Sequence, residues 1–172
     1  NGDFSKKYFA VLIGIPKEKS KRLEHYLKKD ERTNVVKIAP MSEVGAKKAE
    51  LIYNVIDTYE EYIEVPVNFD KRKISQNEIL TNEEPLATHK TEMKAINELS
   101  LVEVELLTGR SHQIRVQMAS LKTPIFGDLK YGKQDGKKLD GIALWAHRLS
   151  FTHPTTKQKM FFESLPPTEQ FP

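Results

Sequence analysis

The chain has 172 residues, of which 38% are hydrophobic and 30% are charged, and it contains no cysteine. This composition is typical of a folded globular protein and excludes the disordered and fibrous classes. The lack of cysteine excludes disulfides, thiol catalysis and every cysteine-ligated zinc site, so we expect a single domain with its own core, located in the cytoplasm.

Charge is distributed unevenly, although the net charge is only +3. Residues 1–48 carry 12 Lys/Arg against 6 Asp/Glu, residues 49–100 carry 5 against 11, and residues 101–172 carry 10 against 7. Such asymmetry fits a protein with one face on a polyanion and another in water, and it fits a solvated mosaic surface equally well. Charge alone therefore leaves the partner open.

The first predicted element is a buried strand over residues 8–15, because an aromatic and β-branched run ends at Pro16. Charged residues follow Pro16 where a signal peptide would need a small-residue cleavage site. No apolar stretch reaches the roughly 20 residues that cross a bilayer, and we expect no membrane association. In the next stretch, residues 23–27, the side-chain spacing fits the apolar stripe of a helix as well as the alternation of a strand. Helix and strand therefore both remain open for this stretch.

Two more strands are predicted over residues 49–57 and 62–67, from their apolar, β-branched and aromatic content. The composition then turns polar and contains residues that break regular structure, which predicts a long loop over residues 68–92. A weak similarity between residues 30–65 and 70–104, at an offset of about 39 residues, is explained by chance or by a tandem duplication.

A strand, a turn and a helix are predicted next. Residues 101–106 alternate strictly, which predicts a strand whose core face carries Val102, Val104 and Leu106. Thr108-Gly109 ends this strand, and Ser111 is a good N-cap for a helix that ends near Pro124. The apolar stripe of this helix consists of Ile114, Met118 and Leu121.

The remaining elements are strands over residues 144–146 and 148–151, a turn at 153–156 and a last strand through 160–162. Strands outnumber helices along the whole chain. The sequence therefore predicts an α+β fold, a mainly antiparallel mixed sheet with a few flanking helices.

The densest chemical signal is the string LTGRSHQIR at residues 107–115, which gathers three cationic or imidazole side chains and an amide at the start of the predicted helix. Positive charge at a helix N-terminus costs about 0.3–1 kcal/mol per charge, so we expect an anion there. Backbone N–H groups with one guanidinium can hold a phosphate, and a second arginine can hold a carboxylate through two hydrogen bonds. The alternative is that these arginines reach solvent or Glu103 and Glu105.

Further strings flank this one in a fixed order. They are KYFAV at residues 7–11 with Gly14, PIFGD at 124–128 with YG at 131–132, and LSF at 149–151 with HP at 153–154. Together with TGRSHQIRV they resemble the RluA-type RNA pseudouridine synthases over most of the chain. The resemblance implies a pseudouridine-synthase-like catalytic domain over residues 1–172. It further implies that uridine is isomerised to pseudouridine in structured RNA, rRNA or tRNA, without cofactor or metal.

The resemblance also implies residue roles. Tyr8 matches the active-site tyrosine that packs on the target base, and Arg115 matches the basic residue paired with the catalytic aspartate. Leu144 falls near the apolar wall of the pocket, where Trp145 replaces a frequent histidine. The predicted RNA-binding residues are Arg110, His112, Gln113, Lys130 and Arg148. For Tyr8, plain packing in a buried strand is the alternative.

The residue types suit that chemistry. A nearby guanidinium favours the ionised form of an aspartate nucleophile in a dry pocket. Stacking on a tyrosine and phosphate contacts from Lys and Arg offset the cost of removing a base from its stack.

One part of the family pattern is missing from these residues. The family carries its nucleophile in an Arg-Leu-Asp motif upstream of the tyrosine strand, and no such string occurs here. Because the first residue is also Asn1, we expect an N-terminally incomplete chain that is inactive by itself. We expect Asp128 to hold a turn, and the length of residues 57–92 to reflect an insertion or a duplication.

Two other functions remain open at this point. A noncatalytic RNA-binding module would keep the fold without the aspartate, and the sequence upstream of Asn1 discriminates it from an enzyme. A metal-dependent hydrolase would use the five histidines, but they lack HExxH or a comparable ligand spacing, so we expect no metal site.

Overall fold

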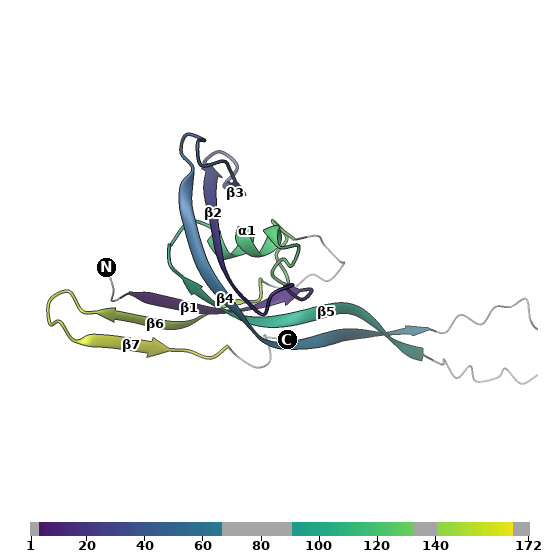
Figure 1. The fold of residues 1–172 in the computed structure, drawn as a ribbon. Helices are drawn as coiled ribbons and strands as arrows, with labels where there is room; N and C mark the ends of the chain where they lie inside the picture. The colour runs from purple at the N-terminus through teal and green to yellow at the C-terminus, as the bar shows by residue number, and fades with distance from the viewer. Residues whose placement is uncertain (1–3, 67–90, 133–140, 167–172) are drawn as a thin grey trace, which may run out of the picture.

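The computed structural model describes residues 4–66, 91–132 and 141–166 (Figure 1). Its strands and helix are, in chain order, β1 (Ser5–Ile13), β2 (Ser20–Asp30), β3 (Val35–Ile38), β4 (Lys47–Pro66), β5 (Thr91–Leu106), α1 (Gln113–Ser120), β6 (Leu144–Thr152) and β7 (Lys159–Glu163). The predicted predominance of strands is confirmed, but the described residues contain one α-helix rather than a few.

All the strands form one antiparallel sheet in the order β3-β2-β4-β5-β1-β6-β7. β1 lies in its interior, with Tyr8 opposite Val104 on β5 and Ala146 on β6. In Figure 1, β2, β3 and the first part of β4 rise steeply from the strands that contain β1, and α1 lies on the inner side of this bend.

The main core lies between α1 and the sheet. Ile114 and Met118 of α1 pack in one cluster with buried side chains of β1, β2, β4 and β5, and Leu121 packs at its margin. The predicted core positions Val102 and Val104 are fully buried, which confirms the alternation of this strand. A second cluster joins Val116 of α1 to β2, β3 and β4 through Leu27, Val36 and Ala49, with Tyr131 against it.

Charged side chains pair across neighbouring strands of the sheet. Lys7 on β1 binds Glu103 on β5 at 2.8 Å, and Arg22 on β2 binds Glu50 on β4 at 2.7 Å. Because alternate residues of a strand point to opposite faces, these residues lie on the face opposite Tyr8, Val104 and the core. The ion pairs therefore lie on the face of the sheet that points away from α1, while Leu51, Val102 and Val104 are buried on the face toward it.

β4 and β5 are much longer than predicted. Residues 47–66 form one strand with irregularities at Val55–Asp57 and Glu61–Tyr62, not two strands, and β5 begins at Thr91 rather than near residue 101. The two strands pair along their whole length, and these cross-strand hydrogen bonds extend both of them through a polar sequence. The rest of the predicted loop, and residues 70–72 and 87 of the weak repeat, lie outside the described residues.

Residues 23–27, for which helix and strand were both open, belong to β2. Leu23 and Leu27 are buried and His25 between them is half-buried on the same face, which is the period of a strand. β3 was not predicted, because its four residues alternate too briefly to give a signal. β6 is one strand, with a bulge opposite Lys7 and Tyr8 where two strands were predicted.

The start of α1 also differs from the prediction. Its N-cap is His112, in the left-handed region at φ 52°, and no side chain caps the helix, so the N-cap predicted at Ser111 is wrong. The reason is the buried Gln113, whose amide turns back toward the preceding loop and holds it in place of a hydroxyl cap.

Candidate active site

The loop between β5 and α1 is held against β4. The backbone oxygen of Glu50 accepts hydrogen bonds from the N–H groups of Leu107 and Thr108, at 3.0 and 3.1 Å, and from Nε2 of Gln113 at 2.9 Å. Oε1 of Gln113 accepts from the Arg110 N–H at 3.0 Å and from the Thr108 hydroxyl at 2.8 Å. The Gln113 amide thus shapes the loop from inside, and its predicted contact with RNA stays a prediction.

Arg110 is presented at the surface by this loop. Its side chain is exposed, and Nε donates to the backbone oxygen of Lys48 on β4 at 2.8 Å. Together with the bond from its own N–H to Gln113, this fixes the base of the guanidinium and leaves the terminal nitrogens for an anion. The predicted RNA-binding role of Arg110 therefore has a suitable, preorganised donor.

His112 lies between α1 and the segment that contains Tyr131. Its Nδ1 is 2.7 Å from the Tyr131 hydroxyl, which also accepts the Val36 N–H at 2.9 Å. We assign the neutral imidazole with its proton on Nε2, so that the Tyr131 hydroxyl accepts the Val36 N–H and donates its own proton to Nδ1. Burial, and then the charges of Arg115 and Lys130, lower the pKa of His112, in agreement with this assignment.

Arg115 binds Asp128 through two hydrogen bonds. Nε donates to Oδ2 at 2.8 Å and Nη2 donates to Oδ1 at 2.7 Å, and the carboxylate of Asp128 is fully buried. Oδ1 also accepts the N–H groups of Lys130 and Tyr131, so Asp128 holds a turn as predicted. Burial raises the pKa of Asp128, but Arg115 and these two N–H groups lower it by more, so the pKa lies below the usual range.

Arg115 was predicted to pair with a catalytic aspartate. In the described residues its carboxylate partner is Asp128, and its guanidinium also lies over the Tyr131 ring at 5.0 Å. Gly132 closes the turn after Tyr131, where an added Cβ would meet the Asp128 backbone oxygen at 2.8 Å. The YG pair at residues 131–132 therefore has a structural reason that the sequence did not reveal.

Lys130 is exposed, and its Nζ donates to the backbone oxygen of Asn34, just before β3, at 2.9 Å. Its charge acts on His112, so these two predicted RNA-binding residues lie in one neighbourhood. Together with Arg110, Gln113 and Arg115 they surround the start of α1. The structure thus brings five of the eight predicted site residues to one end of the helix.

The other three lie on β1 and β6. Tyr8 is opposite Ala146 and Leu144 is opposite Ala10, so Tyr8 and Leu144 share the face of the sheet that packs against α1. Tyr8 also lines a pocket of about 200 Å³ together with Lys6, Ala146, Arg148 and residues of β7. The guanidinium of Arg148 is bound to Glu163 on β7, with both its Nε and its Nη2 at 2.9 Å from Oε1.

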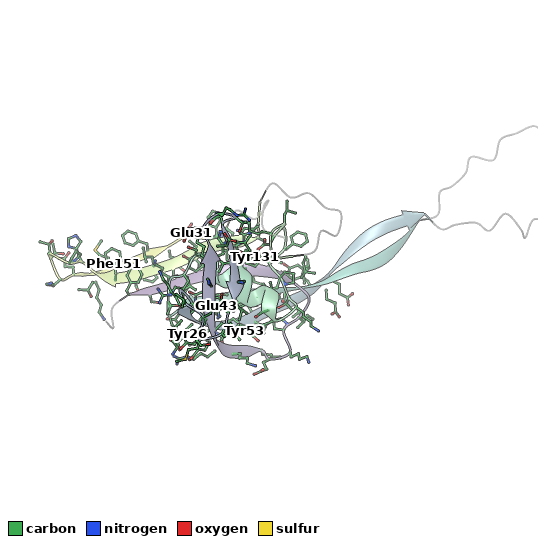
Figure 2. All side chains as sticks on the ribbon, turned by 90° about the horizontal axis from the view of Figure 1, so that it is seen from above. Tyr26, Glu31, Glu43, Tyr53, Tyr131 and Phe151 are labelled. Atoms are coloured by element: carbon green, nitrogen blue, oxygen red, sulfur yellow. The ribbon has the colours of Figure 1, made fainter. Side chains whose placement is uncertain are left out.

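Aromatic side chains lie at the far end of this strand pair. Figure 2 shows Phe151 on the arm formed by β6 and β7, well away from Tyr53 and Tyr131. Its ring centroid is 6.0 Å from that of Phe162 and 6.3 Å from that of Phe4. His147, at the bulge of β6, is buried and stacks on Phe9 at 4.0 Å, a structural role that the sequence did not indicate.

Within the described ranges, no three His, Asp or Glu side chains come together as a metal site. In the same ranges, no helix is long and apolar enough to cross a membrane.

The sequence matches the profile of the family described as RNA pseudouridylate synthase over residues 1–120. The uncharacterized RNA pseudouridine synthase YlyB of Bacillus subtilis is 32% identical over 121 residues, which cover 70% of this chain and 40% of that protein. Ribosomal large subunit pseudouridine synthase D of Neisseria meningitidis is 38% identical over 91 residues, 46% of this chain and 24% of that protein.

The solved structure of human RNA Pseudouridylate Synthase Domain Containing 1 has a TM-score of 0.61 at 22% identity, covering 95% of this chain and 55% of that chain. A second human structure, RNA Pseudouridylate Synthase Domain Containing 4, gives a TM-score of 0.57 at 17% identity. These likenesses show a shared fold. The chain spans less than half the length of the two curated relatives described above.

Proposed function

We propose, from the premise that this chain belongs to the RNA pseudouridylate synthase family, that the whole protein isomerises uridine to pseudouridine in structured RNA. The N1–C1′ glycosidic bond breaks and a C5–C1′ bond forms, while the proton on C5 is lost and N1 gains one. Atoms and charge balance without a redox partner. Because the chain spans only 40% of the YlyB relative, the activity is proposed for the protein as a whole.

The observation that carries the proposal is the preorganised loop after β5. It holds an exposed Arg110 at the end of the sheet where β1 and β5 place Tyr8 opposite Val104. Because Arg110 follows Val104 by six residues, an RNA strand bound by Arg110 is proposed to continue toward the tyrosine that packs on the target base. Gln113 supports this arrangement from inside the loop.

The base-binding site is proposed at the pocket lined by Tyr8 and Arg148. Its apolar floor comes from Ala146 and residues of the neighbouring strands, and Lys6 adds a positive charge beside Tyr8. Stacking of a flipped base on an aromatic side chain is worth about 1–3 kcal/mol, which offsets the loss of stacking in RNA. We assign Leu144 to the apolar wall next to this pocket, because it shares the face of Tyr8.

The nucleophilic aspartate is proposed to come from outside these residues, because no Arg-Leu-Asp string occurs in them. Asp128 does not suit the role, since its carboxylate is fully buried and bound by Arg115 and two N–H groups. A guanidinium has five N–H donors, and Asp128 uses only the edge formed by Nε and Nη2. The other edge of Arg115 is free to hold a second carboxylate ionised.

The test measures tritium released from RNA that carries 5-tritiated uridine, with the whole protein. We expect release in step with pseudouridine formation, and loss of both in Tyr8→Ala. Tyr8→Leu serves as a second variant that keeps apolar volume in the strand, with its melting temperature measured beside the rate. RNA binding without any tritium release by the whole protein would instead support a noncatalytic RNA-binding module.

A further inference from the structure

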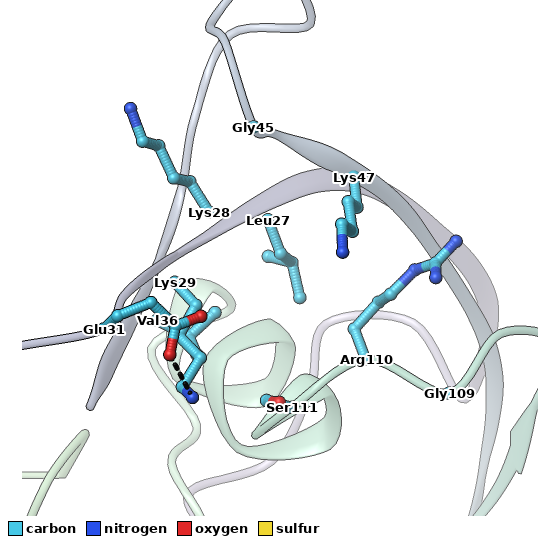
Figure 3. A pocket seen from close by; sticks show the side chains of 10 residues that line it. All are labelled: Leu27, Lys28, Lys29, Glu31, Val36, Gly45, Lys47, Gly109, Arg110 and Ser111. Carbon is cyan, nitrogen blue, oxygen red and sulfur yellow. Dashed lines mark hydrogen bonds and ion pairs between the residues drawn. The ribbon is translucent and has the colours of Figure 1, made fainter.

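A basic groove lies between β2 and the loop before α1, and it shares no lining residue with the pocket at Tyr8. Its volume is about 440 Å³, and the residues that line it include Lys28, Lys29, Glu31, Lys47, Arg110 and Ser111. In Figure 3, Lys28, Lys29 and Glu31 form one wall, and Lys47 and Arg110 form the other. We call this site the basic groove.

The basic groove has an excess of positive charge. Lys28 is bound to Glu43 at 2.9 Å and Lys29 is bound to Glu31 at 2.7 Å, so the charges of that wall are compensated. No carboxylate of the described residues pairs with Lys47 or Arg110, although the adjacent Lys48 binds both Glu24 and Glu50. The uncompensated charge of the groove is thus concentrated on the wall formed by β4 and the loop.

Lys47 and Arg110 are held in place by different elements. Lys47 is the first residue of β4, and its backbone is paired with Leu27 of β2. Arg110 is fixed by its bonds to the Lys48 backbone oxygen and to Gln113. A compact anion between them would meet an ammonium and a guanidinium without a rearrangement of the backbone, which reduces the entropy cost of binding. The hydroxyl of Ser111, which lines the same groove, can add a neutral donor.

The position of the groove suits a linear polyanion. Lys6 of β1 is opposite Leu106 of β5, and the chain reaches Arg110 only four residues later. The groove therefore lies beyond the end of β5 that pairs with the start of β1, on the side of β4. A strand of RNA that reaches Tyr8 has further phosphates on each side of the target nucleotide, and one of them can occupy the groove. An isolated anion would bind in the groove whether or not it is connected to the site at Tyr8.

We propose that the basic groove binds a backbone phosphate of single-stranded RNA through Lys47 and Arg110. This inference rests on the proposed function, since the RNA is taken to be the substrate strand that also reaches Tyr8. Lys47 binds the phosphate as a point charge, and Arg110 binds it through its terminal nitrogens. The ion pairs of Lys28 with Glu43 and of Lys29 with Glu31 keep the opposite wall close to neutral, so that a single phosphate, not a cluster of anions, matches the groove.

The experiment measures binding of the whole protein to a labelled oligouridylate of about 10 nucleotides, a length within the usual site size of single-strand binding domains. The variants are Lys47→Gln, Arg110→Gln and the double variant, and the matched control is Lys17→Gln, which removes the same charge from an exposed loop. A second probe of equal length has uncharged methylphosphonate linkages. Melting temperatures are measured for every variant.

We expect Lys47→Gln to weaken binding roughly two- to five-fold, the effect of an exposed ion pair worth up to about 1 kcal/mol. In the double variant, which removes both cations from the phosphate, the slope of log K against log salt should fall by about 0.7, the value for one phosphate contact on a single strand. Lys17→Gln should change neither quantity. If both cations hold one phosphate, the double variant should lose less than the sum of the single losses.

Three results would overturn the proposal. The first is a Lys47→Gln affinity equal to that of Lys17→Gln, and the second is equal binding of the charged and uncharged oligomers. The third is tighter binding of an acidic peptide, which would assign the groove to a protein partner. Tritium release by the whole protein separates the proposed phosphate site from the proposed enzyme activity. If tritium release is normal and Lys47→Gln leaves RNA affinity unchanged, the phosphate site alone is refuted. Groove-dependent binding without release refutes the enzyme alone.

Discussion

Arg115 on α1 and Asp128 in the following turn form an ion pair with two parallel hydrogen bonds, of 2.8 and 2.7 Å. The carboxylate is fully buried, while the arginine side chain retains 20% exposure. The pair links the helix to the turn that carries Lys130 and Tyr131, because the same carboxylate accepts both of their N–H groups. One aspartate therefore fixes the position of the helix, the turn and the guanidinium.

Arg115→Met should destabilise the fold strongly, because it leaves the buried Asp128 without its counter-charge. Removal of one partner of a buried ion pair costs about 3–5 kcal/mol. Urea unfolding at neutral pH measures the loss. The double variant Arg115→Met/Asp128→Asn should recover most of the stability, because the asparagine oxygen can still accept the N–H groups of Lys130 and Tyr131. If the single and double variants are equally unstable, the ion pair is not the cause.

Acid should weaken the fold through Asp128. Its pKa in the folded protein is lowered, so the folded state favours the ionised form. The resulting stability is fully present above the unfolded pKa of about 3.9 and is lost as pH falls through the folded value. Unfolding free energies measured from neutral pH down to about pH 2 should show this loss. Asp128→Asn should be less stable at neutral pH and should have a flatter acid limb.

Tyr131→Phe should remove the hydrogen-bonded link between β3 and the start of α1. It removes the hydroxyl that accepts the Val36 N–H and donates to Nδ1 of His112, at a cost of about 1–3 kcal/mol when a donor is left unpaired in a partly buried site. The donated bond favours the neutral imidazole, so its loss should raise the pKa of His112. An NMR titration of the His112 ring in the parent protein and in Tyr131→Phe measures this shift.

The same titration has a consequence for stability. The lowered pKa of His112 means that the folded state favours the neutral ring, so its contribution is complete above the unfolded pKa of about 6.5 and is lost as pH falls through the folded value. Tyr131→Phe should reduce this loss in mildly acidic buffer. An unchanged His112 pKa in the variant would contradict the assigned tautomer.

Gln113→Met should release the loop before α1 while keeping the buried volume. The Arg110 N–H loses its acceptor and the Glu50 oxygen loses one donor, so the amide of Arg110 should exchange with solvent much faster. We expect a loss of about 1–3 kcal/mol in unfolding free energy. Gln117→Met is the matched control, because Gln117 is buried one turn later and contacts β2 and β4 rather than the loop. Equal exchange of the Arg110 amide in both variants would argue against the role of Gln113.

Local patterns predicted those parts of the fold that depend on local contacts. The alternation through Val102 and Val104 and the helical stripe through Ile114 and Met118 are signals of this kind, and both were confirmed. The full lengths of β4 and β5 were not predictable, because each strand is extended by hydrogen bonds to the other across a polar sequence. β3 is equally dependent on its partner β2 and on Tyr131.

For the candidate site, the sequence located the loop but not the directions of its side chains. Arg110 and Gln113 are three residues apart in one string, yet one is exposed and the other is buried. The left-handed conformation of His112 and the contact of the loop with Glu50 decide which of them faces solvent. Lys47 gave no signal at all, because its proximity to Arg110 arises only when β4 pairs with β5.

The interior place of β1 sets the order in which the protein can fold. Lys6 pairs with Leu106 and with Leu149, so this strand must wait for partners that follow it by most of the chain length. Pairings between residues so far apart in sequence are slow to form, because the entropy of closing the long loop is lost before any contact between the strands offsets it. Until then Val11 and Leu12, both fully buried in the native sheet, are exposed on an unpaired apolar strand. During synthesis β1 is thus a segment that needs protection against aggregation until its partner strands are made.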